Sequence, residues 1–284
     1  MVRPCPSFST LPDDLLVIVY RLLAGSPSSR ARFRTVCRSW RVAVAAEPPM
    51  PALPWLLLSP CGAHNRTWRA LCPEDGATIS LPPQSGAVGG SLVGGYDGGW
   101  VVFSQPLLRI VNLFTGAEVP LSEKQRRIAC PNVFLSDARG AVVLKIVLNQ
   151  LPTSDGCIMA AMTENCGIML CSVGRPGEGW TTCGYYSLRF KDIAICNGDL
   201  YGVTHDSNNL LKCELSVNKD GDPVVTDDNW IDMQRLTSAS PYKENASYIV
   251  GLNGKLMVIV MNRWWNYPKP FFRVFKLINS NTNT

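Results

Sequence analysis

The sequence predicts a mostly β chain that begins with a small α-helical module. Three observations support this fold class: helical apolar spacing near the N-terminus, a proline-rich stretch after it, and short apolar runs between turn residues over the remainder. The 284 residues can hold one small module and one sizeable domain. We therefore expect a disordered tail at 1–8, a helical module at 9–46, a linker at 47–54, an antiparallel β domain at 55–278 and a disordered tail at 279–284.

The first helix of the module has favourable chemistry at its start. Ser9 or Thr10 can accept an unpaired backbone N–H, Pro12 suits the first turn, and Asp13 and Asp14 complement the positive helix N-terminus. Apolar residues then follow at helical spacing in two neighbouring stripes, which are Leu11, Leu15, Ile18 and Leu22, and Leu16, Val19 and Leu23. The predicted helix is therefore apolar over more than one face.

Two shorter helices are expected to complete the module. Gly25-Ser26-Pro27 ends the first helix, Ser28 or Ser29 can cap the second, and the third runs from about 39 to 46. Three helices in a unit this small cannot bury so much apolar surface among themselves. The surplus must pack either on the rest of this chain or on a second protein, and the spacing alone leaves both alternatives open.

The module resembles the F-box motif in two segments, Leu11-Pro12-Asp13-Asp14-Leu15-Leu16 and Val36-Cys37-Arg38-Ser39-Trp40-Arg41. In that family the apolar helical surface docks onto the Skp-type adaptor of an SCF (Skp-cullin-F-box) ubiquitin ligase. The resemblance implies a three-helix F-box that binds the adaptor and, through it, cullin. It implies adaptor contacts at nine residues, which are Leu11, Pro12, Leu15, Leu16, Ile18, Val19, Val36, Cys37 and Trp40.

This resemblance also implies a function. The protein would be the substrate-recognition subunit of the ligase, with its helices on the adaptor and its β domain on a client protein. The client would then be ubiquitinated and degraded by the proteasome. The chain itself would carry out no bond chemistry.

Positive charge is concentrated in the helical module. Residues 1–46 contain seven arginines and two aspartates, whereas the rest of the chain has 20 basic and 20 acidic residues. Basic helices suit an acidic partner, and the adaptors of the F-box family are acidic. A neutral major domain argues against nucleic acid as the main partner. We expect Lys124-Gln125-Arg126-Arg127, the basic cluster outside the helices, to lie in a solvated loop.

Composition also limits the location and the kinds of site. No stretch approaches the ~20 apolar residues of a membrane span, and the N-terminus lacks the apolar core of a secretion signal. We therefore expect a cytoplasmic or nuclear protein, or one found in both compartments, that does not bind membranes. The eleven cysteines form no Cys-x-x-Cys pair, so we expect reduced and buried thiols, no metal site and no cofactor.

From Trp55 onward the predicted elements are strands, because short apolar runs are bounded by Gly, Pro, Asn or Asp. Residues 195–203 and 251–259 look like copies of one unit, since each places Asn-Gly between apolar strands. Two unrelated hairpins are the alternative. Repeated hairpins at this density favour a β-propeller of about five blades, although a sandwich or barrel would give similar local patterns.

The β region resembles a known domain in the segments 112–121, 191–201 and 248–277. It is the propeller-type domain that follows the F-box in a large plant family, long known as a domain of unknown function. Members of that family usually continue with further strands past the Phe-x-Val-Phe strand. The resemblance therefore implies a β-propeller-like domain whose ring either closes with fewer strands or is shortened at its C-terminus.

The sequence contains none of the common catalytic motifs. There is no Walker loop, no Gly-x-Gly-x-x-Gly, no Gly-x-Ser-x-Gly and no His-Glu-x-x-His. Asp192, Asp199 and Asp206 could converge as a carboxylate pair for glycoside hydrolysis, but each lies near a predicted hairpin turn, where Asp serves backbone geometry. We therefore expect no enzymatic activity and no catalytic residue.

One aromatic segment between two predicted strands is a candidate for client binding. Its residue types dominate interface hot spots, so we predict client contacts at Arg263, Trp264, Trp265, Tyr267 and Phe271. The alternative is an aromatic loop that folds onto its own domain. Two other functions also stay open: an interaction scaffold without a ligase role, whose helices pack on its own sheets, and a carbohydrate-active enzyme.

Overall fold

The structure is a computed structural model of the chain. It describes residues 11–23, 26–47, 55–58, 68–81, 90–128, 141–175, 179–184, 188–205, 209–231, 245–252, 254–262 and 271–277. Both expected tails, and the expected linker beyond residue 47, lie outside the described residues. The chain divides into two compact units, Met1–Ser85 and Gly86–Thr284. This division falls after the expected linker, so the first three strands group with the helices.

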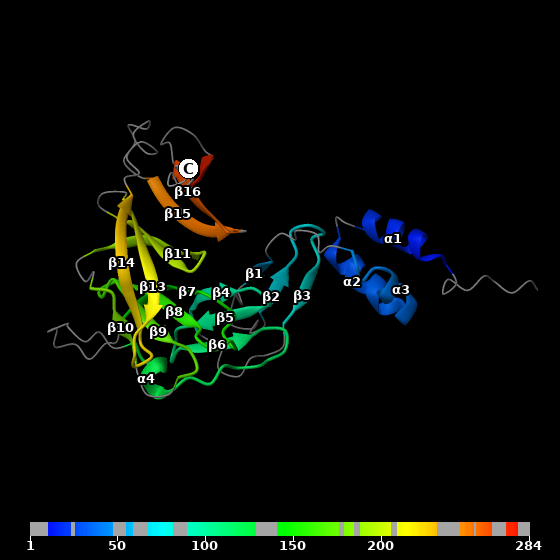
Figure 1. Cartoon of the computed structure of the whole chain (residues 1–284). Helices are drawn as coiled ribbons and strands as arrows, with labels where there is room; N and C mark the ends of the chain where they lie inside the picture. Colours follow the sequence, from blue (N-terminus) through cyan, green and yellow to red (C-terminus); the bar gives the residue numbers. More distant parts are fainter. Residues whose placement is uncertain are drawn as a thin grey trace, which may run out of the picture. The chain divides into compact units, whose positions relative to one another are not determined.

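The described part of the first unit has three helices (Figure 1). They are α1 (Asp13–Leu22), α2 (Pro27–Val36) and α3 (Arg38–Ala43). α1 begins directly after Pro12, with Asp13 and Asp14 in its first turn and without a side-chain hydrogen bond that caps it. None of the helices in the described part of the chain has the length and hydropathy needed to cross a membrane.

The second helix is capped differently from the sequence prediction. Ser26 is the N-cap of α2, and its Oγ accepts the backbone N–H of Ser29 at 3.3 Å. The expected caps, Ser28 and Ser29, instead lie inside the helix. The physical reason is Pro27, which fits the first helical position because it has no N–H to satisfy.

The helical module has its own hydrophobic core. The ring of Phe33 on α2 lies 5.5 Å from the ring of Tyr20 on α1 and 4.4 Å from that of Trp40 on α3, measured between centroids. Leu16 and Val44 are buried in the same cluster. Because the three rings come from three helices, this cluster fixes the helices relative to one another.

The first unit also contains a small antiparallel sheet in the order β1-β2-β3. Its strands are β1 (Leu56–Leu58), β2 (Arg69–Leu71) and β3 (Thr78–Ser80). Asp75, in the turn between β2 and β3, accepts the Ala77 N–H at 2.9 Å. Its carboxylate also accepts the hydroxyl of Ser26 at 3.2 Å, so this turn contacts the start of α2.

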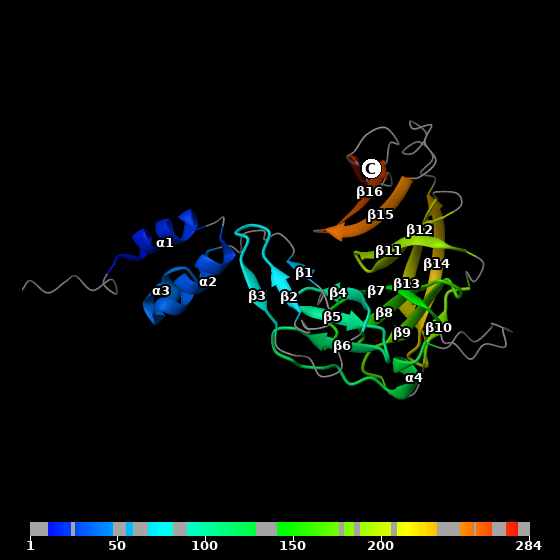
Figure 2. The same cartoon turned by 180° about the vertical axis from the view of Figure 1, so that it is seen from behind.

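In the second unit the described strands form four antiparallel sheets that follow one another along the chain (Figures 1 and 2). Within each sheet, neighbouring strands are consecutive in the chain. The first is formed by β4 (Leu92–Tyr96), β5 (Trp100–Phe103) and β6 (Arg109–Asn112), and the second by β7 (Val143–Leu148), β8 (Ile158–Thr163), β9 (Ile168–Ser172) and β10 (Thr181–Thr182). The third is formed by β11 (Phe190–Cys196), β12 (Asp199–Thr204), β13 (Leu210–Val217) and β14 (Pro223–Ile231), and the fourth by β15 (Asn245–Leu252), β16 (Lys255–Asn262) and β17 (Phe271–Lys276).

Neighbouring sheets of this unit contact each other through their first strands. β4 contacts β7, β7 contacts β11, and β11 contacts β15. Two glycines allow a close approach: a Cβ atom on Gly94 would clash with the carbonyl oxygen of Ile146, and one on Gly251 with that of Ile195. The first strands therefore pack backbone against backbone, as the inner strands of successive blades do in a propeller.

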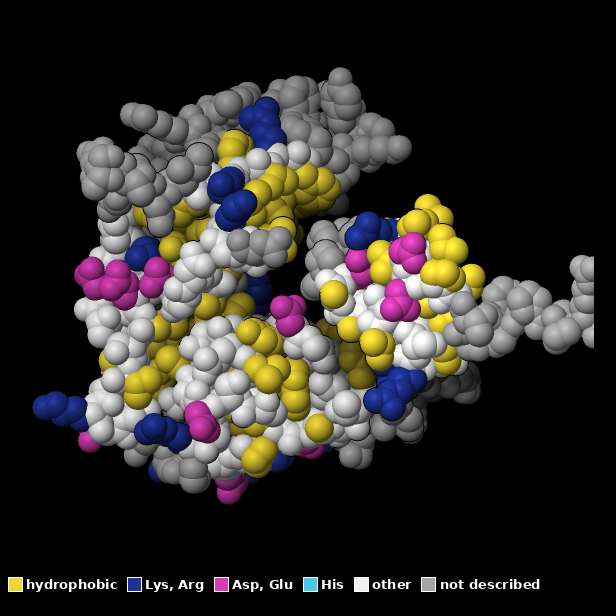
Figure 3. Space-filling view, turned by 45° about the vertical axis from the view of Figure 1, so that its right-hand side comes forward, with side chains coloured by type: hydrophobic (Ala, Val, Ile, Leu, Met, Phe, Trp, Pro, Cys, Tyr) yellow, Lys and Arg dark blue, Asp and Glu magenta, His cyan; other side chains and the backbone are white. Residues whose placement is uncertain are grey.

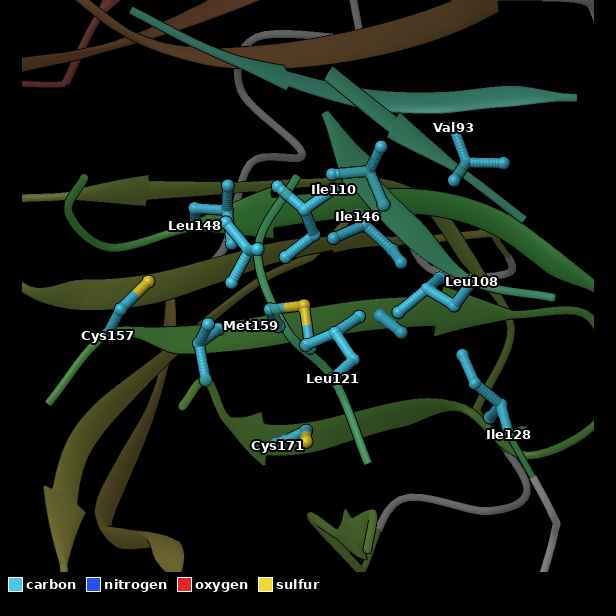
Figure 4. Packing of buried hydrophobic residues seen from close by; sticks show 14 of the residues in the cluster. Val93, Leu108, Ile110, Leu121, Ile128, Ile146, Leu148, Cys157, Met159 and Cys171 are labelled. Atoms are coloured by element: carbon cyan, nitrogen blue, oxygen red, sulfur yellow. The ribbon is translucent and has the colours of Figure 1, made fainter. Parts of the chain in front are cut away.

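Among the described residues, three hydrophobic clusters lie between consecutive sheets of the second unit. The first joins the β4–β6 sheet to the β7–β10 sheet and includes the fully buried Ile110, Ile146 and Met159 (Figure 4). The second combines residues of β8 and β9 with residues of β11 to β13. The third combines residues of β11 to β13 with residues of β15 and β16. Each sheet is therefore held to the next by its own apolar layer.

The two Asn-Gly segments occupy equivalent hairpins. Asn197 and Gly198 form the turn between β11 and β12, with φ angles of 53° and 90°. Gly254 lies in the corresponding turn between β15 and β16. Asn197 Nδ2 donates to the carbonyl oxygen of Gly254 at 3.0 Å, so the two turns are in contact. Each segment is therefore a turn between the first two strands of its sheet, which the prediction of one repeated unit requires.

The basic cluster at 124–127 is not the solvated loop that we expected. It overlaps a short helix, α4 (Glu123–Arg126), which begins with a capping box between Ser122 and Gln125. Gln125 is buried, and its side-chain amide donates to the carbonyl oxygens of Ser172 at 2.6 Å and Arg175 at 3.1 Å. This helix therefore ties the segment after β6 to the end of β9.

The described cysteines are in two states. Free thiols are present at Cys37, Cys72, Cys157, Cys171, Cys183, Cys196 and Cys213. Burial raises the pKa of Cys157 to about 11 and that of Cys171 to about 12, so both thiols stay protonated at neutral pH. Cys166 is disulfide-bonded, and the expectation of reduced cysteines is wrong for this residue.

Candidate functional site

Four apolar side chains form an exposed stripe along α1, which we call the α1 stripe. Leu15, Ile18, Val19 and Leu22 are spaced at i, i+3, i+4 and i+7, so they share one face of the helix. Their exposed fractions are 46%, 51%, 42% and 80%. Leu16, on the other side of α1, is only 1% exposed. Figure 3 shows hydrophobic side chains at the surface of the helical module. α1 therefore has two apolar faces, one buried in the module and one exposed.

The structure separates the nine predicted adaptor residues by exposure. Exposed positions are Pro12, Leu15, Ile18, Val19 and Val36. Partly buried positions are Leu11, Cys37 and Trp40, of which Leu11 and Trp40 pack against the core of the module. Leu16 belongs to that core, so it supports the α1 stripe from behind and offers no surface to a partner.

Two further apolar residues of the helical module are exposed but were not in the predicted set. Leu22 continues the α1 stripe, and its helical spacing from Leu15 and Ile18 was visible in the sequence. Val42 of α3 is also exposed. The sequence offers no way to distinguish Val42 from Val44, which is buried in the core two residues later.

Arginine side chains are held at specific places on the module. The guanidinium carbons of Arg30 and Arg34 lie 4.6 Å and 5.2 Å from the ring centroid of Tyr20, and Arg30 also donates to the Tyr20 hydroxyl at 3.1 Å. Arg21, at the end of α1, donates twice to the Glu47 carboxylate, at 2.8 Å and 2.9 Å. These hydrogen bonds lower the pKa of Glu47. The α1 stripe thus lies on a module whose charge is mainly positive.

Cys37 lies between α2 and α3, beside the predicted adaptor surface. Its Sγ is 3.1 Å from the Oγ of Ser39. This hydrogen bond, together with a weaker one to the backbone of Trp40, lowers the pKa of the Cys37 thiol. Cys37 is partly exposed, so a reagent that attacks thiolates can report whether a partner covers this surface.

The predicted client-binding residues cannot be placed as side chains. Arg263, Trp264, Trp265 and Tyr267 lie outside the described residues, and Phe271 begins β17 with its side chain outside them. The described surface next to them is the sheet β15–β16–β17. Tyr248 and Val250 on β15 are exposed there.

The candidate catalytic carboxylates do not form a pair. Asp192 is buried in β11: Oδ1 accepts from Lys145 Nζ at 2.6 Å, and Oδ2 accepts from the Ile249 N–H at 2.9 Å. In the β11–β12 hairpin, Asp199 pairs with Cys196, and Cys196 lies four residues along β11 from Asp192. That spacing is roughly 13 Å, whereas glycosidases hold their two carboxylates about 5 to 9.5 Å apart. Asp206 lies outside the described residues.

The polar contacts of these carboxylates are structural. Asp192 connects the first strands of three consecutive sheets, since Lys145 lies on β7 and Ile249 on β15. Asp199 forms an ion pair with Lys212 at 3.0 Å. Within the described residues, no three His, Cys, Asp or Glu side chains come together as a group that could hold a metal ion.

Comparison with known proteins identifies the β region. The family model described as the KIB1-4 beta-propeller matches residues 65–283. No protein with curated annotation matches the sequence. The match to the family model includes β2 and β3, so it starts before the boundary between the two compact units.

Two solved structures are similar to the chain at low identity. A structure of YCF48 bound to D1 peptide matches with 12% identity and a TM-score of 0.39, over 72% of this chain and 56% of that chain. The WD40 domain of SCAP from fission yeast matches with 12% identity and a TM-score of 0.30, over 75% of this chain and 59% of that chain. The match therefore spans less than two thirds of either structure.

Proposed function

The chain belongs to the KIB1-4 beta-propeller family, and on this premise we propose that it is the substrate-recognition subunit of an SCF-type ubiquitin ligase. The propeller fold supports a role as a protein-interaction scaffold. In the proposal the α1 stripe binds a Skp-type adaptor, and the β domain binds a client protein. The function combines the two surfaces in one chain.

The α1 stripe is the observation that carries the proposal. One apolar face of α1 is buried on Phe33 and Val44, and the other is exposed to solvent. Covering the exposed half of the four side chains is worth roughly 1 kcal/mol for each residue, from the area removed from water. Association costs reduce this gain. The F-box resemblance of 11–16 and 36–41 supports a Skp-type adaptor as the protein that covers the stripe.

In this proposal the chain acts by proximity. Binding of client and adaptor at the same time raises the effective concentration of client lysines near the ligase's ubiquitin carrier. The chain then needs no catalytic group of its own. The structural role of Asp192 and Asp199 is consistent with this, because both carboxylates already have lysine partners.

Substitution in the α1 stripe tests the proposal. In the full chain, Leu15→Asp places a charge on the exposed face and leaves the core residue Leu16 unchanged, so adaptor capture falls at least tenfold while the far-UV circular dichroism stays the same. Val217→Asp is the matched control, because Val217 is similarly exposed at 41% but lies on β13. Adaptor capture by Leu15→Asp at the wild-type level overturns the assignment.

Alkylation of Cys37 provides a second readout of the same contact. The free chain reacts at Cys37 at mildly alkaline pH because its thiol pKa is lowered, and the adaptor slows this reaction by covering the surface. Cys171 is the internal reference, because its buried thiol has a pKa of about 12 and stays unreactive in both states. The measurement is peptide mass spectrometry after a short pulse of iodoacetamide.

A further inference from the structure

Charge is segregated between the last two sheets of the second unit. From Asn245 to Leu277 the sequence has no acidic residue, and the described strands β15 to β17 carry three basic residues, Lys255, Arg273 and Lys276. From Leu210 to Ile231, which spans β13 and β14, it has five acidic residues and two lysines. The chain as a whole is nearly balanced outside its helices. The C-terminal sheet is therefore a local positive region beside an acidic one.

One face of the C-terminal sheet is apolar and exposed. The register aligns Tyr248 with Ile259 and Val274, so these three side chains lie on the same face of neighbouring strands. The same register places Val250 and Phe272 on this face. Tyr248, Val250, Phe272 and Val274 are all exposed, and Phe272 and Val274 on β17 reach 58%. The other face, with Ile249 and Val258, is buried against the preceding sheet.

Lysines border this apolar face. Lys276 is aligned with Met257 and Val250, and Lys255 with Leu252, so both lysines are on the exposed side of the sheet. Neither lysine takes part in an ion pair with another of the described residues. The face thus combines apolar side chains with positive charges that attract acidic groups.

The outer strand of this sheet, β17, directs some of its backbone N–H and C=O groups away from β16. The two preceding sheets have four strands, but within the described residues β17 pairs only with β16. Leu277 donates its N–H to Leu256 on β16. Backbone groups alternate sides along an antiparallel strand, so Phe272, Val274 and Lys276 direct their N–H and C=O groups to the outer edge. Such an edge is a template for another strand.

We propose that the β15–β16–β17 sheet binds an extended client segment that carries both acidic and apolar residues at every second position, so that both kinds of side chain face the same side of the sheet. The segment pairs with the outer edge of β17, its apolar side chains contact Phe272 and Val274, and its carboxylates pair with Lys255 and Lys276. Charge complementarity selects an acidic segment, and the backbone groups of β17 select an extended peptide. This inference rests on the proposed function only in naming the segment as part of the client.

A protein segment fits these observations better than nucleic acid. All four exposed side chains named on the face are aromatic or branched aliphatic groups in strand register, and two lysines border them. Nucleic acid recognition depends on many phosphate contacts. Backbone pairing along a strand edge is, in contrast, specific for a polypeptide.

Selection from a random 12-residue phage library on the full-length chain tests the inference. We expect enriched sequences in which Asp or Glu and apolar residues share every second position. We also expect the corresponding synthetic peptides to bind more weakly in fluorescence polarisation as salt rises. Lys255→Glu combined with Lys276→Glu reduces their affinity at least tenfold. Val274→Pro also reduces peptide affinity, because the proline removes a backbone N–H that points to the outer edge and leaves every hydrogen bond to β16 in place.

Matched controls separate this site from others. Lys219→Glu makes one such Lys-to-Glu change in the β13–β14 hairpin and leaves peptide affinity unchanged, and it is compared with Lys255→Glu and Lys276→Glu as single variants. Leu15→Asp also leaves peptide affinity unchanged. Enriched peptides without acidic bias, or peptides whose affinity is unaffected by the β17 variants, overturn the inference. Tighter binding of a single-stranded oligonucleotide than of the peptides to the same face also overturns it. Because Leu15→Asp affects only adaptor capture, failure here and failure of the ligase proposal are distinguishable.

Discussion

At the scale of single residues, Asp192 shows what the sequence could not reveal. In the sequence, Asp192 was a candidate for a carboxylate pair together with Asp199 and Asp206, and its position near a predicted hairpin turn suggested a role in backbone geometry. The partners of Asp192 are 47 and 57 residues away, at Lys145 and Ile249. No local pattern connects such distant positions. The residue therefore has a structural role that only the packing of three sheets defines.

The structural role of Asp192 makes a measurable prediction. Asp192→Ala leaves the Ile249 N–H and the Lys145 ammonium without their acceptor, so we expect a loss of about 3 kcal/mol in the free energy of unfolding. Asp199→Ala breaks a partly exposed ion pair with Lys212 and costs less than about 1 kcal/mol. Urea denaturation of both variants measures the difference. Equal losses would contradict the assignment of Asp192 as the connection between β7, β11 and β15.

Leu15 and Leu16 show the same limit on α1. They are identical neighbours in the sequence, and the helical spacing assigns them to two adjacent stripes. The spacing correctly indicates that both stripes are apolar, but it does not show which one faces inward. Packing against Phe33 and Val44 decides this, and it buries Leu16. The sequence therefore predicted which helix carries the candidate adaptor surface, but not which side of that helix is exposed.

At the scale of elements, local chemistry predicted some structures and was overlooked in others. The first helix was predicted within a few residues of its observed bounds, since apolar spacing and the two aspartates at its start agree. The short helix α4 was missed, although Ser122 followed three residues later by Gln125 is the pattern of a capping box. The charges in the segment 124–127 suggested a solvated loop. The burial of Gln125 was not visible locally, because it depends on hydrogen bonds to Ser172 and Arg175, which are distant in the sequence.

Glycines in the first strands provide a test of how the sheets pack. A Cβ atom at Gly94 would clash with the Ile146 carbonyl of the next sheet, whereas a Cβ atom at Gly95 would be 3.6 Å from the Trp100 carbonyl oxygen. We expect Gly94→Ala to lower the free energy of unfolding by about 2 kcal/mol through overpacking. Gly95→Ala, its matched control, changes it by less than about 1 kcal/mol. Thermal unfolding of the two variants checks the order, and a more stable Gly94→Ala would show that the strands are farther apart.

At the scale of the whole molecule, the sequence predicted the kinds of element better than the boundary between units. Composition indicated helices followed by β-sheets, and the described residues have this order with five sheets. The proline-rich stretch suggested a boundary at 47–54, whereas the compact units divide after Ser85. Proline content indicates that a segment is extended and stiff, but it does not show where the fewest residue contacts cross between the two units. The contact between Ser26 and Asp75 joins β1–β3 to the helices across that stretch.

Removal of the helical module tests how independent the β-sheets are. Each hydrophobic cluster in the described part of the chain draws its residues from one unit only. A chain that begins at residue 48 therefore loses the α1 stripe and the hydrogen bond between Ser26 and Asp75, but it keeps the three clusters between sheets. One lost hydrogen bond is worth about 1 kcal/mol, which shifts the thermal midpoint by about 2 to 4 °C in a domain of this size. Strand circular dichroism and peptide binding should persist while adaptor capture disappears. If the shortened chain unfolds or aggregates instead, the helices are part of the β fold, and a scaffold whose helices pack on its own sheets becomes the better description.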